Sequence, residues 1–173
     1  MAMPQPDGPQ FLPRLNKKQH KLRQEALVRG PDYVRNLHQT AIYDSGVSDV
    51  LDNHPRFETI TANDVLAVSK RIQEESRQAL RQAGFSDIIP VWRSEYADVG
   101  KKIDRVNRVV PVTIKEGGLK DFRKPHNVTR AYNIRLDDVL SQFVVGPYKR
   151  WITDEGEIQV EEGRLMPRDL GEK

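Results

Sequence analysis

Apolar residues recur at helical spacing in the first half of the chain and predict three helices. The first covers residues 16–29 and is followed by a glycine, and the second begins at a proline and covers residues 31–46. The third covers residues 62–83, and the four residues Thr-Ala-Asn-Asp at 61–64 have the order of a capping box. Residues 47–58 contain a proline and are predicted to form a short helix or a loop.

The second half of the chain alternates apolar and polar residues, which is typical of half-buried strands. Strands are predicted at residues 88–93, with Arg93 as the last residue, at 109–114 and at 132–136. A further strand near 157–161 would bury one face and leave the other polar. Because helices come first and strands follow, the predicted fold class is α+β, with a small and mostly antiparallel sheet of about three to five strands.

The last predicted strand carries two carboxylates. Glu155 and Glu157 are separated by Gly156, so both side chains would project from the same side of the strand. Like charges at this spacing repel unless water or a cation screens them. Two interpretations follow: a solvated acidic edge, or a carboxylate site that binds sugar hydroxyls or a cation.

Composition limits the classes to which this chain can belong. It has 173 residues, of which 37% are hydrophobic and 31% are charged, and its mean hydropathy is −0.68. We expect a flexible arm at residues 1–15, one domain at 16–165 and a tail at 166–173. The absence of cysteine excludes disulfides, thiolate metal sites and a thiol nucleophile. The histidines are scattered without metal-ligand spacing, so no metal is expected.

The charge is distributed unevenly along the chain. The net charge is +3 and the pI is about 9.2. Residues 14–35 and 101–124 are basic, whereas the C-terminal end is acidic. The basic segments could contact nucleic-acid phosphates or acidic surfaces of neighbouring subunits. Against nucleic acid, few aromatic residues lie among the basic ones, and no helix-turn-helix or RNA-binding signature is present.

Sequence signals for a membrane or for secretion are missing. No apolar run is long enough to span a bilayer, and residues 1–6 lack the apolar core of a secretory signal. The chain is therefore expected to be soluble, without a membrane partner, and to be cytoplasmic, virion-associated or a delivered effector.

Two segments resemble bacterial and phage mono-ADP-ribosyltransferases. Residues 79–93, ALRQAGFSDIIPVWR, resemble the helix, glycine and arginine-ended first strand of that family, and residues 133–160 resemble its last strands with their Glu-x-Glu pair. The resemblance implies a split sandwich and the transfer of ADP-ribose from NAD to an unknown protein acceptor. It places Arg93 at the phosphate or ribose of NAD, Glu157 at the nicotinamide ribose, and Glu155 at the acceptor.

Two further residues join this candidate site. The family has a Ser-Thr-Ser strand between the two segments, for which Thr113 is the nearest counterpart, and Trp92 could stack on the adenine or nicotinamide ring. Ser94 stands where the family usually has a glycine. A carboxylate at the ribose would stabilise the positive charge that grows as nicotinamide leaves, and an arginine fork suits a diphosphate.

The rival hypothesis is a non-catalytic assembly or binding protein of phage or bacterial origin. Its basic N-terminal segment would contact nucleic acid or neighbouring subunits, and its acidic C-terminal end would dock on another copy. Catalytic activity and oligomeric state are left open by the sequence.

Overall fold

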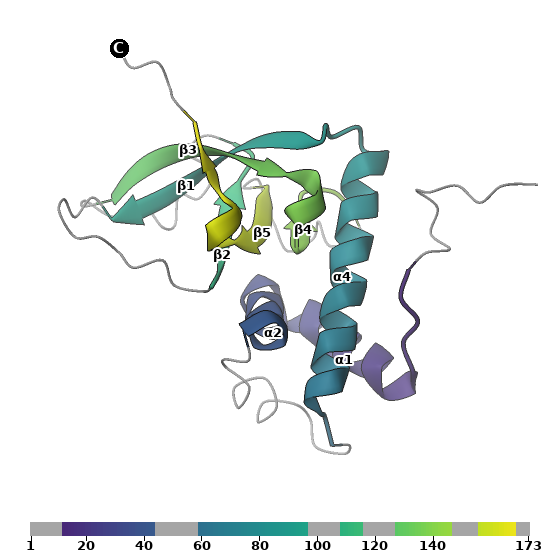
Figure 1. The fold of residues 1–173 in the computed structure, drawn as a ribbon. Helices are drawn as coiled ribbons and strands as arrows, with labels where there is room; N and C mark the ends of the chain where they lie inside the picture. Colours follow the sequence, from purple (N-terminus) through teal and green to yellow (C-terminus); the bar gives the residue numbers. More distant parts are fainter. Residues whose placement is uncertain (1–11, 44–58, 97–107, 116–126, 147–155, 169–173) are drawn as a thin grey trace, which may run out of the picture.

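The computed structural model describes residues 12–43, 59–96, 108–115, 127–146 and 156–168. Within these ranges three helices precede a six-stranded sheet (Figure 1), which confirms the predicted α+β class. The helices are α1 (Lys17–Arg29), α2 (Pro31–Tyr43) and α4 (Ala62–Gln82). The strands are β1 (Ile88–Tyr96), β2 (Val109–Thr113), β3 (Asn127–Arg135), β4 (Ser141–Phe143), β5 (Glu157–Glu161) and β6 (Met166–Pro167). Two 3-10 turns, η3 (Leu136–Asp138) and η5 (Glu162–Arg164), follow β3 and β5.

Several predictions concern residues outside the described ranges. These are the loop or helix at 47–58, Glu155, most of the basic span 101–124 and most of the arm at 1–15. In the described part of the chain, no helix has both the length and the apolar character that crossing a bilayer requires.

Two of the helices begin at capping boxes. The side chain of Asn16 accepts a hydrogen bond from the backbone of Gln19 at 2.8 Å, and the Gln19 side chain accepts one in return from the Asn16 backbone at 3.1 Å. Thr61 and Asp64 make the same reciprocal pair at the start of α4, at 3.2 and 2.9 Å. Gly30 ends α1 with φ 104°, a conformation that glycine adopts without strain. The predicted helix starts are therefore confirmed.

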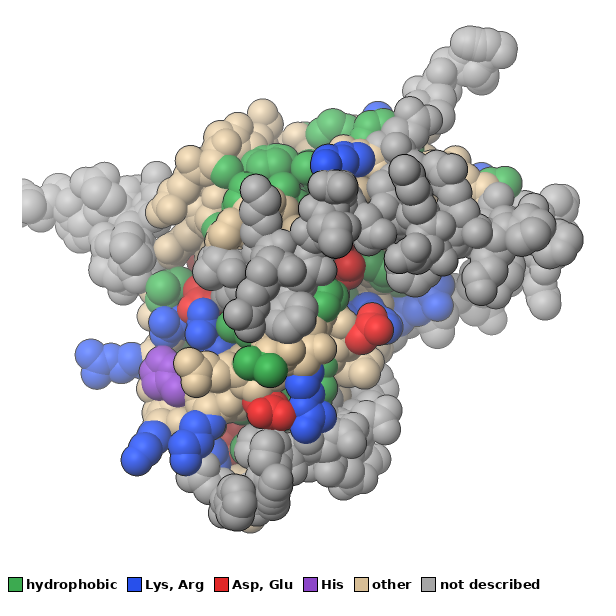
Figure 2. Space-filling model, turned by 180° about the vertical axis from the view of Figure 1, so that it is seen from behind, with side chains coloured by type: hydrophobic (Ala, Val, Ile, Leu, Met, Phe, Trp, Pro, Cys, Tyr) green, Lys and Arg blue, Asp and Glu red, His purple; other side chains and the backbone are tan. Residues whose placement is uncertain are grey.

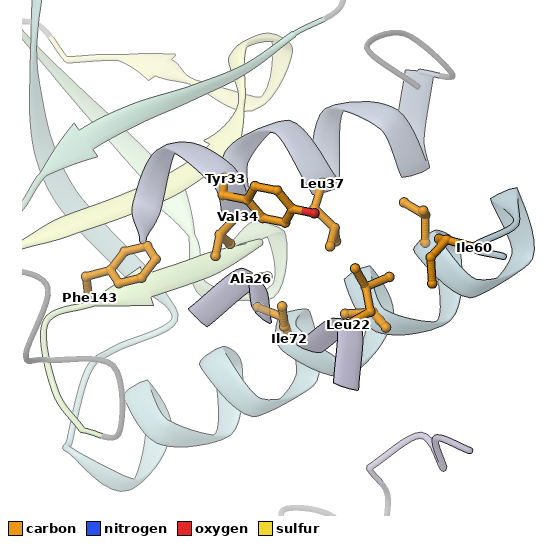
Figure 3. Packing of buried hydrophobic residues seen from close by; sticks show 10 residues of the cluster. Leu22, Ala26, Tyr33, Val34, Leu37, Ile60, Ile72 and Phe143 are labelled. Atoms are coloured by element: carbon orange, nitrogen blue, oxygen red, sulfur yellow. The ribbon is translucent and has the colours of Figure 1, made fainter. Parts of the chain in front are cut away.

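The three helices pack around one apolar cluster (Figure 3). Their apolar stripes face one another, and α4 contacts both α1 and α2. Phe143 of β4 reaches this cluster from the sheet, so it connects the two layers of the molecule. The other buried members are Leu22, Ala26, Tyr33, Val34, Leu37, Ile60, Val65, Val68 and Ile72.

The strands form one sheet in the order β4-β5-β2-β1-β3-β6, and every neighbouring pair is antiparallel. β1 and β3 pair from Ile88 opposite Arg135 to Tyr96 opposite Asn127. The prediction that Arg93 is the last residue of its strand is wrong, because the ladder with β3 continues beyond it. The split sandwich is not confirmed by this single sheet, and β6 lies within the predicted C-terminal tail.

The two faces of the sheet contact different parts of the molecule. Residues paired across antiparallel strands point to the same face, and neighbours along a strand alternate. One face, which we call the inner face, carries Val112 and Ile158 and forms a second apolar cluster with Leu80 of α4 and Leu136 of η3. The opposite face, which we call the outer face, includes Phe143 and packs against α2 at β2 and β4.

Candidate functional site

The sheet register places three of the five predicted site residues in one row. Trp92 of β1 lies opposite Thr113 of β2, which lies opposite Glu157 of β5. All three side chains therefore belong to the outer face. Arg93 follows Trp92 along β1 and belongs to the inner face, while Glu155 lies outside the described residues. The register thus separates Arg93 from Glu157, the two residues that a bound NAD would have to bridge.

Glu157 lies inside the protein. Its residue is 9% exposed, and its carboxylate accepts a hydrogen bond of 3.0 Å from the side chain of Gln159. Gln159 also donates to the carbonyl of Pro31 in α2 at 2.9 Å and accepts from the hydroxyl of Ser141 at 2.5 Å. The solvated-edge interpretation of Glu157 is wrong, because β4 pairs with β5 and makes it an interior strand. This polar cluster joins the sheet to α2.

Arg93 belongs to a chain of ion pairs on the inner face. Its Nη1 lies 2.9 Å from Glu95 Oε2 and 3.3 Å from Glu162 Oε2, and its side chain is 12% exposed. Glu162 also pairs with Arg108 at 2.9 Å, and Glu95 pairs with Arg130 at 2.9 Å. Three arginines and two glutamates therefore alternate from the residue before β2 through η5 and β1 to β3, and the charge of Arg93 is compensated within the protein.

Two tyrosines donate hydrogen bonds to glutamates near this region. Tyr132 donates to Glu95 at 2.5 Å, and Tyr43 donates to Glu161. Burial raises the pKa of both phenols, and the hydrogen bond to the carboxylate raises it further. Both hydroxyls therefore stay protonated at neutral pH and do not act as bases.

The positions of Arg93, Glu157 and Thr113 do not favour the predicted NAD site. A diphosphate at Arg93 would have to displace Glu95 and Glu162, and Glu157 lies on the opposite face of the sheet. Thr113 is buried, and its hydroxyl accepts a hydrogen bond of 3.1 Å from a backbone N–H two residues further on. The described residues do not bring the predicted site together, and the transferase activity stays a prediction.

Basic side chains gather on the solvent side of α1. One stripe of exposed positions follows helical spacing and contains no carboxylate: Lys17, His20, Lys21, Gln24 and Val28. Arg14 is exposed just before the helix. Figure 2 shows Lys and Arg side chains around a histidine, and His20 is the exposed histidine of the described residues. We call Arg14, Lys17, His20 and Lys21 the basic face of α1.

Cations on the other side of α1 are neutralised by α4. Lys18 Nζ lies 2.9 Å from Asp64 Oδ2, and Arg23 Nη2 lies 2.8 Å from Glu75 Oε1. Lys17, in contrast, forms no ion pair with any carboxylate of the described residues. The four residues of the basic face of α1 are exposed, and Lys17 among them is unpaired within the described residues.

Neither metal ligation among the described residues nor similarity to known proteins indicates a function. In the part of the chain that the structure describes, no group of three or more His, Asp or Glu residues could hold a metal ion. No protein-family model matches the sequence, and no curated protein or solved structure shows significant similarity to it. Function therefore has to be inferred from the chain's own chemistry.

Proposed function

We propose that this protein is a non-catalytic nucleic-acid-binding protein and that the basic face of α1 contacts phosphates. The observation that carries the proposal is that Arg14, Lys17, His20 and Lys21 are all exposed along one side of α1, whereas Lys18 and Arg23 on the other side pair with carboxylates of α4. Clustered exposed cations attract a polyanion, and the counterions of the polyanion are released when the cations bind it.

The spacing of the lysines fits a phosphate backbone. Lys17 and Lys21 are one helical turn apart, which is ~6 Å along the axis of α1. Phosphates of one strand of a duplex are spaced by about 3.4 Å along its axis, so the two lysines can reach neighbouring phosphates. The first turn of α1 contains no acidic residue, and the partial positive charge of its N-terminus adds to the attraction. Such contacts carry no base information, so the binding should be independent of sequence.

The test compares two variants that lose the same charge from different surfaces. The double variant Lys17→Gln/Lys21→Gln removes two cations from the basic face. Its control, Lys70→Gln/Lys115→Gln, removes two exposed lysines, one from α4 and one from the segment that follows β2. The measurement is the fluorescence anisotropy of a labelled oligonucleotide at several salt concentrations. We expect the α1 variant to bind more weakly and the slope of log K against log salt to fall by about one for each lysine.

Two outcomes would overturn the proposal. One is an equal loss of affinity in the control variant, because the effect would then follow net charge and not this face. The other is binding to an acidic peptide that is as tight as binding to the oligonucleotide, which would indicate a protein partner.

The ADP-ribosyltransferase remains the alternative function, and the shared row of Trp92, Thr113 and Glu157 is what supports it. Its test is the release of nicotinamide from NAD by the whole protein and the loss of that release in Glu157→Gln. If the wild-type protein releases nicotinamide and Glu157→Gln does not, the result would favour the enzyme over the binding protein.

A further inference from the structure

The two faces of the sheet differ in how their arginines are compensated. On the inner face, Arg93, Arg108 and Arg130 all pair with glutamates. On the outer face, Arg135 lies opposite Ile88 at the end of the β1–β3 ladder, and Arg168 follows β6. Neither of these two arginines forms an ion pair with a carboxylate of the described residues. Within the described residues, the outer face at β1, β3 and β6 therefore carries two arginines without an ion pair.

Arg168 is fixed over an aromatic ring. Its guanidinium carbon lies 4.7 Å from the centre of the Trp92 ring, a cation–π distance. Its Nε donates to the carbonyl of Tyr132 and its Nη2 to the carbonyl of Val91, both at 2.9 Å. Ala131 lies between them, since it is opposite Trp92 and its carbonyl accepts from the Arg168 backbone at 3.0 Å. The small alanine side chain leaves room for the arginine to reach the ring across β3.

Around this pair, several described residues of the outer face are exposed, and none of those that the register places there is Asp or Glu. Ile88 is 43% and Met166 is 37% exposed, and Pro90 is exposed as well. The register places all of them on the outer face, with Asn133 between Pro90 and Met166. β1, β3 and β6 lie in the upper part of Figure 1, away from α1 and α2. We call this surface the outer platform and define it by Pro90, Trp92, Asn133, Arg135, Met166 and Arg168.

We propose that the outer platform binds single-stranded nucleic acid, with a base stacked on the Trp92–Arg168 pair and a phosphate at Arg135. The inference deepens the proposed nucleic-acid binding and rests on it. Aromatic rings and guanidinium planes on an open sheet stack with the exposed bases of a single strand, whereas the bases of a duplex are already stacked on one another. The charge of the platform, two arginines and no carboxylate, complements the backbone of such a strand.

The dimensions of the platform fit a short strand. Arg135 is four residues from Ala131 along β3, which is ~13 Å in an extended chain. Asn133 lies halfway, and its amide offers both a donor and an acceptor to a base edge. The platform can therefore contact a base, a base edge and a phosphate of one extended segment.

The experiment uses the fluorescence of Trp92 itself. The sequence contains two tryptophans, so the background variant Trp151→Phe leaves Trp92 as the only tryptophan, which is excited selectively at wavelengths that tyrosine does not absorb. Oligothymidylate is added to the full chain, and a duplex of the same length serves as the comparison. We expect the single strand to quench the Trp92 emission and the duplex to leave it almost unchanged, because only unpaired bases can stack on the ring.

Matched variants separate the platform from general charge. Arg135→Gln removes a platform cation, and Arg130→Gln removes an exposed arginine from the inner face of the same strand. We expect Arg135→Gln to lower the salt slope for the single strand by about one and Arg130→Gln to leave it unchanged. Trp92→Leu should bind on the order of tenfold more weakly, and Trp92→Phe should retain most of the affinity because it keeps a ring.

The outcomes distinguish this inference from the proposed function. If the protein binds the oligonucleotide through the basic face of α1 while Trp92 emission stays constant, the platform inference fails and the proposed function stands. Equal effects of Arg135→Gln and Arg130→Gln would also overturn the inference. If no oligonucleotide binds even at low salt, both fail.

Discussion

At the scale of single residues, the ionisation of His38 is strongly coupled to folding. It is completely buried in α2, and its Nδ1 lies 2.7 Å from Ser69 Oγ in α4. Burial lowers the pKa of His38 to about 3, and the positive charge of Arg77 contributes to the shift. The imidazole is therefore neutral in the folded protein at every pH at which the protein is expected to work.

This shift predicts a loss of stability in weak acid. Below the ordinary histidine pKa of 6.5, the unfolded chain binds a proton at His38 that the folded chain does not bind. The free energy of unfolding should then fall with decreasing pH, by at most about 1.4 kcal/mol per pH unit, until the folded-state pKa is reached. Urea unfolding between about pH 7 and 5 measures this slope.

Two variants isolate the contribution of His38. His38→Gln should unfold with a flatter pH dependence than the wild type, because the titrating group is gone. His20→Gln, at the exposed histidine of α1, should keep the wild-type slope. Equal slopes in His38→Gln and the wild type would show that another group controls the acid response.

At the scale of elements, α4 and β4 join the two apolar clusters. Val65, Val68 and Ile72 of α4 lie in the helical cluster, whereas Leu80 near its end lies in the inner-face cluster. β4 is short, but its Phe143 is fully buried among the helices. The helical layer and the sheet should therefore unfold together.

Replacing Phe143 tests this coupling. Phe143→Ala removes a fully buried ring from the contact between layers and should lower the free energy of unfolding by about 3–5 kcal/mol. Val28→Ala, at a position that is 59% exposed, should change it by less than about 0.5 kcal/mol. Urea unfolding measures the stability of both variants. Similar free energies of unfolding for Phe143→Ala and Val28→Ala would contradict the account.

The helices could be predicted from the sequence because their signals are local. Asn16 and Thr61 satisfy N-terminal N–H groups within their own first turn, and Gly30 ends α1. Strand pairing depends on residues far apart in the chain, so the sequence does not predict that β4 pairs with the strand that carries Glu157. The strand at 141–143 is polar and short, and it is what turns β5 from an edge into an interior strand.

The same reason explains what was missed at the surfaces. The basic character of α1 follows from composition, and the sequence predicts it. The outer platform could not be predicted from the sequence. Its residues Trp92, Arg135 and Arg168 come from three different segments and meet only through the register of β1, β3 and β6. The few aromatic residues among the basic segments argued against nucleic acid, yet the aromatic ring and its cations come together in space.

At the scale of the whole molecule, charge is sorted between surfaces. The net charge is only +3, and several cations are neutralised by ion pairs on the inner face and between α1 and α4. Within the described residues, exposed cations also lie on the basic face of α1 and on the outer platform. The central claim is that these two surfaces hold a nucleic-acid backbone.

The salt dependence of oligonucleotide binding by the unmodified protein tests this claim most directly. If Arg14, Lys17, Lys21 and Arg135 each contact a phosphate, log K for a single strand should fall linearly with log salt with a slope of about −3. The single strand should also bind more tightly than a duplex of equal length, since only it can use the platform. An affinity that does not change with salt, or no binding at low salt, would contradict the account.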